Sequence, residues 1–398
     1  MSDLLFLAHR VPYPPDRGDK VRSHHILRHL SAMGRVHLAA FADDERDLGH
    51  DAALGEWCAS VNITWRGKSQ ARSAIEALAT GRPVSLTAFD ASAMRDAVRR
   101  LLDARRYEAI YVYSGQMAQY LPVDARFVMD FVDMDSAKFA AYAETARRPA
   151  KWMFAREARM LAAFERSIAA RADASLFVSE AEADLFRRSS NGANVHAIGN
   201  GIDTAFFDPD VPVAPVHEAG PLIVFTGQMD YRPNIEAVCR FAKQVLPAIR
   251  LHHPNARFAI VGRKPVAVVR ALAGGAVIVT GEVADVRGWL NAASVVVAPL
   301  LLARGVQNKV LEAMAMARPV VASTAAAEGI DHCGTIRVAG NDHAMAAAID
   351  GLLRDRPAAD GLGRAARSCV VQRYGWGSRL APLGALLGLV PGGWRDEG

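Results

Sequence analysis

Short apolar runs rich in valine, isoleucine and phenylalanine alternate along the chain with longer stretches whose apolar residues recur every three or four positions. The short runs have the length of buried strands, and the longer stretches have the period of helices that bury one face. Regular alternation of the two is typical of parallel sheets covered by helices on both faces. In the first half we expect strands at Leu4–Ala8, Val36–Phe41, Val61–Thr64, Ala109–Tyr113, Phe127–Phe131 and Ala174–Val178, and a long helix around Trp152–Ala170.

The same pattern is clearer in the second half of the chain. There we expect strands at Leu222–Thr226, Arg257–Val261, Val277–Thr280, Ser294–Ala298 and Pro319–Ala322. A helix opening at Pro233 carries an apolar face made of Ile235, Val238, Ala242, Val245 and Ile249. The pattern therefore predicts a doubly wound α/β sheet, in which ligands bind beyond the carboxyl ends of the strands.

The chain is long enough for two domains. Its 398 residues exceed the size at which a single hydrophobic core keeps growing. The segment Asp208–Pro215 holds three prolines in eight residues, which suits neither a helix interior nor a central strand. We predict an N-terminal domain over residues 1–205, a C-terminal domain over 206–375, and a closing segment over 376–398 that packs back toward the N-terminal domain.

Composition and charge narrow the classes of function. The net charge of +5 suits an anionic ligand or an anionic membrane surface. Nucleic-acid binding is not expected, because no basic run is interleaved with aromatic residues. No stretch reaches the roughly 20 apolar residues of a membrane-spanning helix. Four cysteines are widely spaced without a CxxC pair, namely Cys58, Cys239, Cys333 and Cys369. We interpret them as reduced thiols of a cytoplasmic protein, forming neither a disulfide framework nor a metal site.

The strongest chemical signal follows the expected strand Ser294–Ala298. A loop containing Gly305 leads into a helix predicted to start near Gln307. The first turn of a helix has unpaired N–H groups and the positive end of the helix dipole, which together favour a phosphate. Lys309 lies in that turn, where the positive end of the helix dipole disfavours a cation. A bound anion between the ammonium group and the helix end would remove this conflict. Glu312, one turn further, can accept hydrogen bonds from vicinal hydroxyls such as those of a ribose. An ordinary amphipathic helix with both side chains in solvent is the alternative.

The run Lys309–Val321 resembles the nucleotide-binding signature of the family-4 retaining glycosyltransferases. Other segments resemble the same family, in the same order and over nearly the whole chain. They are Pro12–Arg22, Gly199–Asp203, Phe225–Asn234, Phe258–Gly262 and Val279–Val283. The resemblance is closest to the sugar transferases found with bacterial exopolysaccharide systems of the PEP-CTERM/EpsH type.

This resemblance implies the GT-B fold, in which two Rossmann-like doubly wound domains face each other across a cleft. It implies an enzyme of the hexosyltransferase class that moves a sugar from a nucleotide-diphosphate sugar, a co-substrate, to a glycan or lipid-linked acceptor. It further implies retention of anomeric configuration without a cofactor or a metal. The expected setting is exopolysaccharide or cell-surface glycan synthesis in the cytoplasm, with peripheral contact with the inner face of the cell membrane.

The helix-start argument and the resemblance together give the candidate site residues. As catalytic residues we predict Lys309, Glu312 and Arg263. As donor-binding residues we predict Gly18, Gly227, Gln228, Gly262, Arg304, Gly305, Val306, Gln307, Asn308, Lys309 and Glu312. On the acceptor side we predict Arg17, Lys20, Asp133 and Asp135. The spacing of the last two would also suit a metal ion, but we favour orientation of the acceptor or capping of the following helix.

The chain departs from the family pattern at three places, two of which usually hold diphosphate-binding cations. Many relatives have a glutamate where this chain has Arg304, an arginine in place of Gln228, and Lys-Gly in place of Pro233-Asn234. Replacement cations could come from Lys309, Arg304, Arg263 or Lys264, or from Arg17 or Lys20 in the other domain. We rank Lys309 first because it lies at the predicted helix start.

Three other functions fit parts of the sequence. A sugar-nucleotide epimerase on the same architecture binds the same donor and needs no sugar acceptor. A donor-binding protein that has lost catalysis is conceivable because of Gln228 and Arg304. A nicotinamide-dependent oxidoreductase is disfavoured, because no Gly-x-Gly-x-x-Gly turn follows any expected strand.

Overall fold

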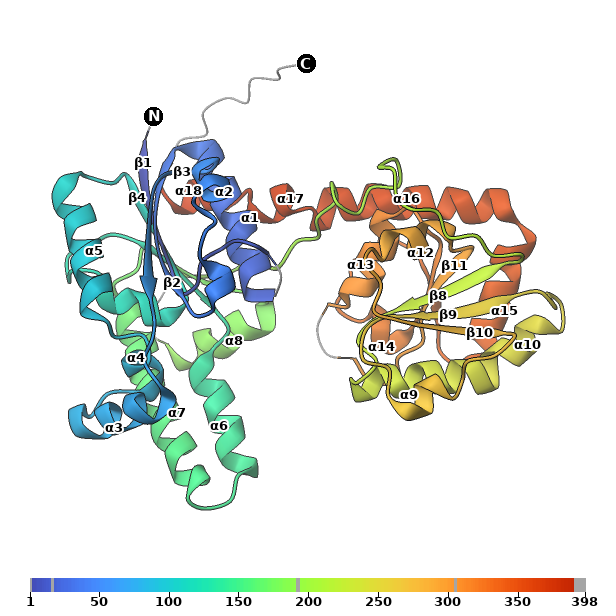
Figure 1. Cartoon of the computed structure of the whole chain (residues 1–398), viewed down its shortest axis with the longest axis horizontal. Helices are drawn as coiled ribbons and strands as arrows, with labels where there is room; N and C mark the ends of the chain where they lie inside the picture. Colours follow the sequence, from blue (N-terminus) through green and yellow to red (C-terminus); the bar gives the residue numbers. More distant parts are fainter. Residues whose placement is uncertain (1, 16–17, 191–193, 304–305, 390–398) are drawn as a thin grey trace. The chain divides into compact units, whose positions relative to one another are not determined.

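The computed structural model describes residues 2–15, 18–190, 194–303 and 306–389. Its contacts divide the chain into two compact units, both visible in Figure 1. Unit 1 comprises Met1–Asn200 and Arg379–Gly398, and unit 2 comprises Gly201–Ser378. Each unit contains its own sheet and packs around its own hydrophobic core, as expected of separate domains.

Among the described residues of unit 1, seven strands form a parallel sheet in the order β3-β2-β1-β4-β5-β6-β7. They are β1 (Asp3–Ala8), β2 (Arg35–Ala42), β3 (Cys58–Trp65), β4 (Ala109–Tyr113), β5 (Val128–Val132), β6 (Ala174–Phe177) and β7 (Val195–Ala197). The helices are α1 (Gly18–Met33), α2 (Asp51–Gly55), α3 (Gln70–Thr80), α4 (Val84–Thr87), α5 (Ser92–Ala104), α6 (Asp135–Thr145), α7 (Ala150–Ala169), α8 (Glu180–Ser189) and α18 (Leu383–Leu386). Short 3-10 turns are η1 (Glu45–Asp47) and η2 (Gly115–Tyr120).

The described part of unit 2 contains a six-stranded parallel sheet in the order β10-β9-β8-β11-β12-β13. Its strands are β8 (Leu222–Thr226), β9 (Arg257–Val261), β10 (Val277–Gly281), β11 (Val295–Ala298), β12 (Val320–Ser323) and β13 (Arg337–Ala339). Its helices are α9 (Arg232–Arg240), the π-helical turn η3 (Phe241–Val245), α10 (Leu246–Arg250), α11 (Ala267–Arg270), α12 (Arg287–Ala292), α13 (Asn308–Ala315), α14 (Thr324–Ala327), α15 (Asp342–Arg354) and α16 (Arg356–Tyr374). Helix α17 (Trp376–Leu380) contains the second boundary between the units.

The strand order of each sheet reverses once, between β1 and β4 in unit 1 and between β8 and β11 in unit 2. Such a reversal leaves a crevice at the carboxyl ends of the two flanking strands, where open α/β sheets bind ligands. The predicted doubly wound architecture is therefore confirmed in both units. No helix in the described ranges has the length and apolar content needed to cross a bilayer.

Every strand that the apolar runs predict is present. Ala109–Tyr113, Leu222–Thr226 and Arg257–Val261 have the predicted bounds. The two strands absent from the prediction are β7 and β13, which have three residues each and lie at the sheet edges. A half-exposed edge strand of this length contains no apolar run that the sequence pattern can detect.

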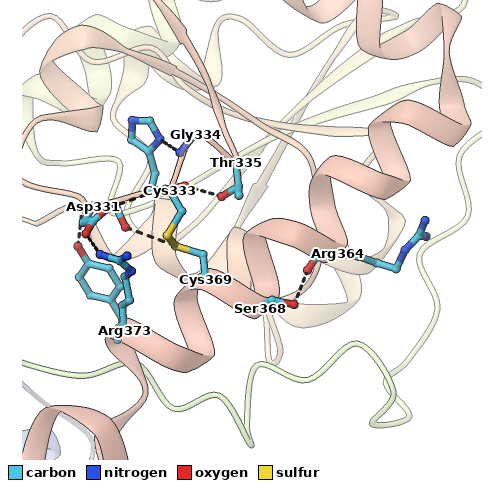
Figure 2. The surroundings of a disulfide bond; sticks show 10 residues. Asp331, Cys333, Gly334, Thr335, Arg364, Ser368, Cys369 and Arg373 are labelled. Carbon is cyan, nitrogen blue, oxygen red and sulfur yellow. Dashed lines mark hydrogen bonds and ion pairs between the residues drawn. A yellow bond between two sulfur atoms is a disulfide. The ribbon is translucent and has the colours of Figure 1, made fainter.

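A disulfide joins Cys333 and Cys369 in unit 2, so the interpretation of all four cysteines as reduced thiols is wrong. Cys333 lies in the loop before β13 and Cys369 lies in α16, with Cα atoms 6.4 Å apart. Figure 2 shows the bond beside Asp331, whose carboxylate pairs with Arg373. The backbone N–H of Asp331 also donates to the hydroxyl of Tyr374 at 2.7 Å. The pairing depends on how α16 packs against this loop, which the spacing of the cysteines does not reveal.

Removal of the disulfide should destabilise unit 2, because the bond restricts the unfolded chain across 36 residues of sequence. We expect Cys369→Ser to lower the free energy of unfolding by about 2–4 kcal/mol under non-reducing conditions. Urea denaturation measures this, with Cys239→Ser as the control because Cys239 is a free thiol. Equal stability of the wild type and Cys369→Ser would contradict the pairing.

Candidate functional site

A pocket of about 550 Å³ lies in unit 2, at the carboxyl ends of β8 and β9 and the start of α13. This is the side of the sheet at which its topology predicts a ligand. The pocket is lined by the candidate residues Gly227, Gln228, Gly262, Arg263, Val306, Gln307, Asn308, Lys309 and Glu312. The fold thus brings together residues that are as much as 85 positions apart in the sequence, since Gly227 and Glu312 share one pocket.

Two glycines form the floor of the pocket, and the geometry there excludes any side chain. Gly227 and Gly262 follow β8 and β9, with φ of +156° and +151°. A β-carbon on Gly262 would lie 1.7 Å from the backbone oxygen of Gly227. A β-carbon on Gly227 would lie 2.8 Å from Nδ2 of Asn234 and 3.1 Å from Nζ of Lys309. The glycines therefore let two loops and the lysine approach each other closely.

The ammonium group of Lys309 lies over this floor and has a neutral partner. Its Nζ donates to Oδ1 of Asn234 at 2.7 Å and lies 4.2 Å from the ring centroid of Phe225. Asn234 is itself only 5% exposed and donates through Nδ2 to the backbone oxygen of Gln228 at 2.9 Å. The amide thus fixes the position of the lysine without neutralising its charge.

Burial lowers the pKa of Lys309 to about 8, while the nearby carboxylate of Glu312 acts in the opposite direction. Among the described residues no carboxylate lies within ion-pair distance of Nζ. Lys309 is therefore a partly buried cation that lacks a counter-ion from the described protein, and an anionic ligand would supply one.

Glu312 lies one turn deeper in α13, where burial raises the pKa of its carboxyl to about 7 against the opposing charge of Lys309. The carboxyl group borders the same pocket. Because it accepts hydrogen bonds when ionised and can donate one when protonated, it suits a polar ligand group such as a hydroxyl.

A second cation, Arg263, follows Gly262 directly and is held by Gln228. With the amide of Gln228 oriented so that its oxygen faces the guanidinium, this oxygen accepts from Nε of Arg263 at 2.9 Å and also from Nη2. The backbone oxygen of Arg263 accepts from the N–H of Met229 at 2.9 Å, which joins the loops after β8 and β9. Lys264 is exposed, and its Nζ lies 3.7 Å from Asp230.

The amino end of α13 borders the pocket through Gln307, Asn308 and Lys309. Gln307 occupies the N-cap position, and its side chain makes no capping hydrogen bond. The first-turn N–H groups of an eight-residue helix with this start therefore remain suited to hydrogen bonding with a ligand.

The remaining candidate residues belong to unit 1 or lie outside the described residues. Arg17, Arg304 and Gly305 fall in the undescribed positions. Gly18 is the first residue of α1. Lys20 is 1% exposed and donates to Oδ1 of Asp47 at 2.6 Å. The ammonium group of Lys20 is therefore buried in an ion pair within unit 1, and its contact with an acceptor stays a prediction.

Asp133 and Asp135 border a small recess of unit 1 at the carboxyl end of β5. Asp133 is exposed, and Oδ2 of Asp135 accepts from Gln116 at 3.4 Å. Burial raises the pKa of Asp135. The N–H of Ser136 at the start of α6 donates to Glu165 at 3.0 Å, so Glu165 rather than Asp133 caps this helix.

Asn234 is a central residue of the unit 2 pocket that is absent from the predicted site residues. It lies next to Pro233 at the start of a helix that follows a glycine-ended strand. An asparagine at such a position is a signal for a polar contact at the carboxyl edge of the sheet.

Comparison with known proteins gives the class of this fold and pocket. Residues 220–355, which include every residue of the unit 2 pocket, match the family described as Glycosyl transferases group 1. No curated protein sequence matches the chain.

Several solved structures resemble the whole chain. Sucrose-phosphate synthase from Thermosynechococcus elongatus is 17% identical with a TM-score of 0.59, over 97% of this chain and 98% of that one. HepE from Anabaena, solved in complex with UDP, is 14% identical with a TM-score of 0.62, over 97% and 99%. A glycosyltransferase from Rickettsia africae is 12% identical with a TM-score of 0.62, over 97% of each chain.

At these identities the likeness establishes the two-domain GT-B fold, and the match of unit 2 adds the class of chemistry. The protein is a glycosyltransferase built from two Rossmann-like parallel-sheet domains.

The raised pKa of Glu312 makes the stability of the ligand-free protein depend on pH. A carboxyl whose pKa is about 7 in the folded state and 4.5 unfolded stabilises the fold fully below about pH 4.5. That contribution, at most about 3 kcal/mol, is lost as pH rises through about 7. Glu312→Gln has no carboxyl group at this position, so this loss should be absent. The free energy of unfolding of the variant, relative to that of the wild type, should therefore increase from pH 5 to pH 8.

Urea unfolding at the two pH values measures this difference, with Glu282→Gln as a control at an exposed position of the same pocket. If Glu312→Gln showed the same pH dependence as the wild type, the carboxyl would not be perturbed as described.

Proposed function

We propose that the unit 2 pocket binds the nucleoside diphosphate of a sugar donor, and that the enzyme transfers the sugar to a glycan or lipid-linked acceptor. The observation that carries the proposal is the partly buried ammonium of Lys309, held by the neutral Asn234 beside the amino end of α13. A cation, first-turn N–H groups and glycines that permit close approach together suit a diphosphate.

Two features support a nucleotide sugar as the particular anion. Glu312 lies at the distance of one helical turn from Lys309, where it would accept hydrogen bonds from the vicinal hydroxyls of a ribose. The structurally similar HepE has been solved in complexes with UDP and with UDP-glucose.

The chemistry required is departure of a diphosphate from the anomeric carbon. Negative charge grows on the leaving phosphate, and fixed positive groups and N–H donors lower the barrier when they are aimed at that charge. In this proposal Lys309 and Arg263 supply the cations and the first turn of α13 supplies the N–H donors. Gln228 positions Arg263 through its side-chain oxygen. We propose retention of configuration and independence of metal ions on the basis of the family resemblance.

The same resemblance supports a role in exopolysaccharide or cell-surface glycan synthesis, in the cytoplasm at the inner face of the membrane. A donor-binding protein without transferase activity is the second candidate, because Gln228 replaces a cation that many relatives use. A glycosylated acceptor as the product would distinguish the proposed transferase from the two alternatives. A sugar-nucleotide epimerase would release free epimerised sugar nucleotide, and a donor-binding protein would bind the donor without forming a product.

Loss of the central charge should weaken donor binding specifically. Hydrogen bonds to charged groups contribute about 1.5–3 kcal/mol, so we expect Lys309→Ala and Glu312→Ala each to lower the affinity for the preferred nucleotide about tenfold or more. Isothermal titration with a panel of nucleoside diphosphates and their sugars measures this, after circular dichroism has established that each variant is folded.

The matched control is Lys264→Ala, which removes a neighbouring but exposed cation that is paired with Asp230. Unchanged affinity in Lys309→Ala would show that the nucleotide binds elsewhere. No binding of any nucleotide by the wild type would remove the proposal altogether.

A further inference from the structure

The charged side chains that line the unit 2 pocket are of both signs. Two cations, Arg263 and Lys309, and two carboxyl groups, those of Glu282 and Glu312, border it. Glu312 is partly buried and already has a role in the proposed function, whereas Glu282 is exposed and has none. A carboxylate does not suit the diphosphate of a nucleotide, because the two negative groups repel each other. Glu282 therefore suits a different part of the ligand.

Glu282 lies at one end of the row of strand ends that borders the pocket. It follows directly after β10, the edge strand of the sheet, which lies beside β9 and then β8 (Figure 1). The N–H of Gly262 donates to the backbone oxygen of Gly281 at 3.1 Å, so the end of β10 adjoins the glycine floor. Lys309 lies instead at β8, with its Nζ over the ring of Phe225. Two strand spacings, about 10 Å, separate β10 from β8.

The carboxylate of Glu282 has no partner within the described part of the chain. No hydrogen bond or ion pair joins it to another described residue, although Arg263 borders the same pocket. The guanidinium of Arg263 is held by the side-chain oxygen of Gln228. The neighbouring Asp285, by contrast, pairs with Arg287 at 2.7 Å. Both oxygens of the Glu282 carboxylate are therefore available to accept hydrogen bonds from a ligand.

Apolar side chains flank Glu282 in the pocket. Val283 and Val286 line it from the segment between β10 and α12, and both are half-buried. The face of a nucleobase is a flat ring that packs well against apolar side chains, whereas its edge carries hydrogen-bonding groups. An apolar wall beside one carboxylate therefore suits a base better than it suits a sugar, which carries hydroxyl groups on most of its carbons.

We propose that Glu282 recognises the base of the donor nucleotide and selects guanine. The inference rests on the proposed function, because it takes the diphosphate to lie at Lys309 and the base to lie toward β10. Guanine presents two adjacent donors on one edge, the ring N1–H and the exocyclic amine. The two oxygens of a single carboxylate can accept both hydrogen bonds at once.

The other common bases lack this pair of donors. Uracil has one N–H between two carbonyl oxygens, which a carboxylate repels. Adenine and cytosine each have an acceptor nitrogen beside the exocyclic amine. HepE has been solved with UDP, but at 14% identity this likeness does not determine the base bound here. UDP shares the diphosphate and ribose with GDP, so it still binds to the same pocket at higher concentrations.

Isothermal titration of the full chain with GDP, inosine diphosphate and UDP tests the proposal. In the wild type, GDP should bind about tenfold more tightly than UDP, a discrimination within the range of one bidentate contact to a base. Inosine diphosphate lacks the exocyclic amine and should bind with intermediate affinity. In Glu282→Ala the affinity for GDP should fall to nearly that for UDP, and the difference between GDP and inosine diphosphate should disappear.

The matched control is Asp230→Ala. This variant removes an exposed carboxylate from the loop after β8 that does not line the pocket. It should retain the wild-type order of the three affinities, which separates recognition of the base from a general change in charge. Circular dichroism should show both variants folded, because both side chains are exposed.

Two results would overturn the proposal while leaving the proposed function intact. One is a wild type that binds UDP as tightly as GDP, or more tightly. The other is a preference for GDP that Glu282→Ala retains, because another group would then recognise guanine. Absence of binding by all three nucleotides would instead remove the proposed function, and this proposal with it.

Discussion

The hydrogen bond between Lys309 and Asn234 is the interaction on which the unit 2 pocket depends. An ammonium ion that is partly removed from water normally acquires a carboxylate partner, which fixes it but cancels its charge. Here a buried amide holds the ammonium group in place, and no carboxylate of the described residues forms an ion pair with it. Burial lowers the pKa of Lys309 to about 8, so the charged form still predominates at neutral pH. The position is therefore preorganised for an anion.

The backbone makes this arrangement possible. Gly227 and Gly262 end adjacent parallel strands, and their lack of side chains allows the loops to approach within contact of each other and of the lysine. The reversal of strand order between β8 and β11 opens the sheet edge at the same place. The amino end of α13 adds backbone N–H donors to the pocket. An anionic ligand would therefore be held by these donors as well as by the side chains. Sheet topology, glycine and helix end thus converge on one location.

The elements of this pocket could be predicted because each has a local signature. Apolar runs mark β8 and β9, a glycine marks the end of each strand, and Lys309 stands out because it opposes the helix dipole. Contacts between distant side chains have no such signature. Asn234 was not predicted as a site residue, because its role depends on the 2.7 Å distance to Lys309. Lys20 has the same charge as Lys309, yet it is buried against Asp47, and the Cys333–Cys369 bond likewise arises from packing.

A crystal structure of the protein with bound UDP would locate the diphosphate directly. We predict a phosphate oxygen within hydrogen-bonding distance of Nζ of Lys309 and the first-turn N–H groups of α13, with the ribose hydroxyls at Glu312. A nucleotide bound away from α13, or a diphosphate held by other residues while Lys309 contacts only Asn234, would contradict it.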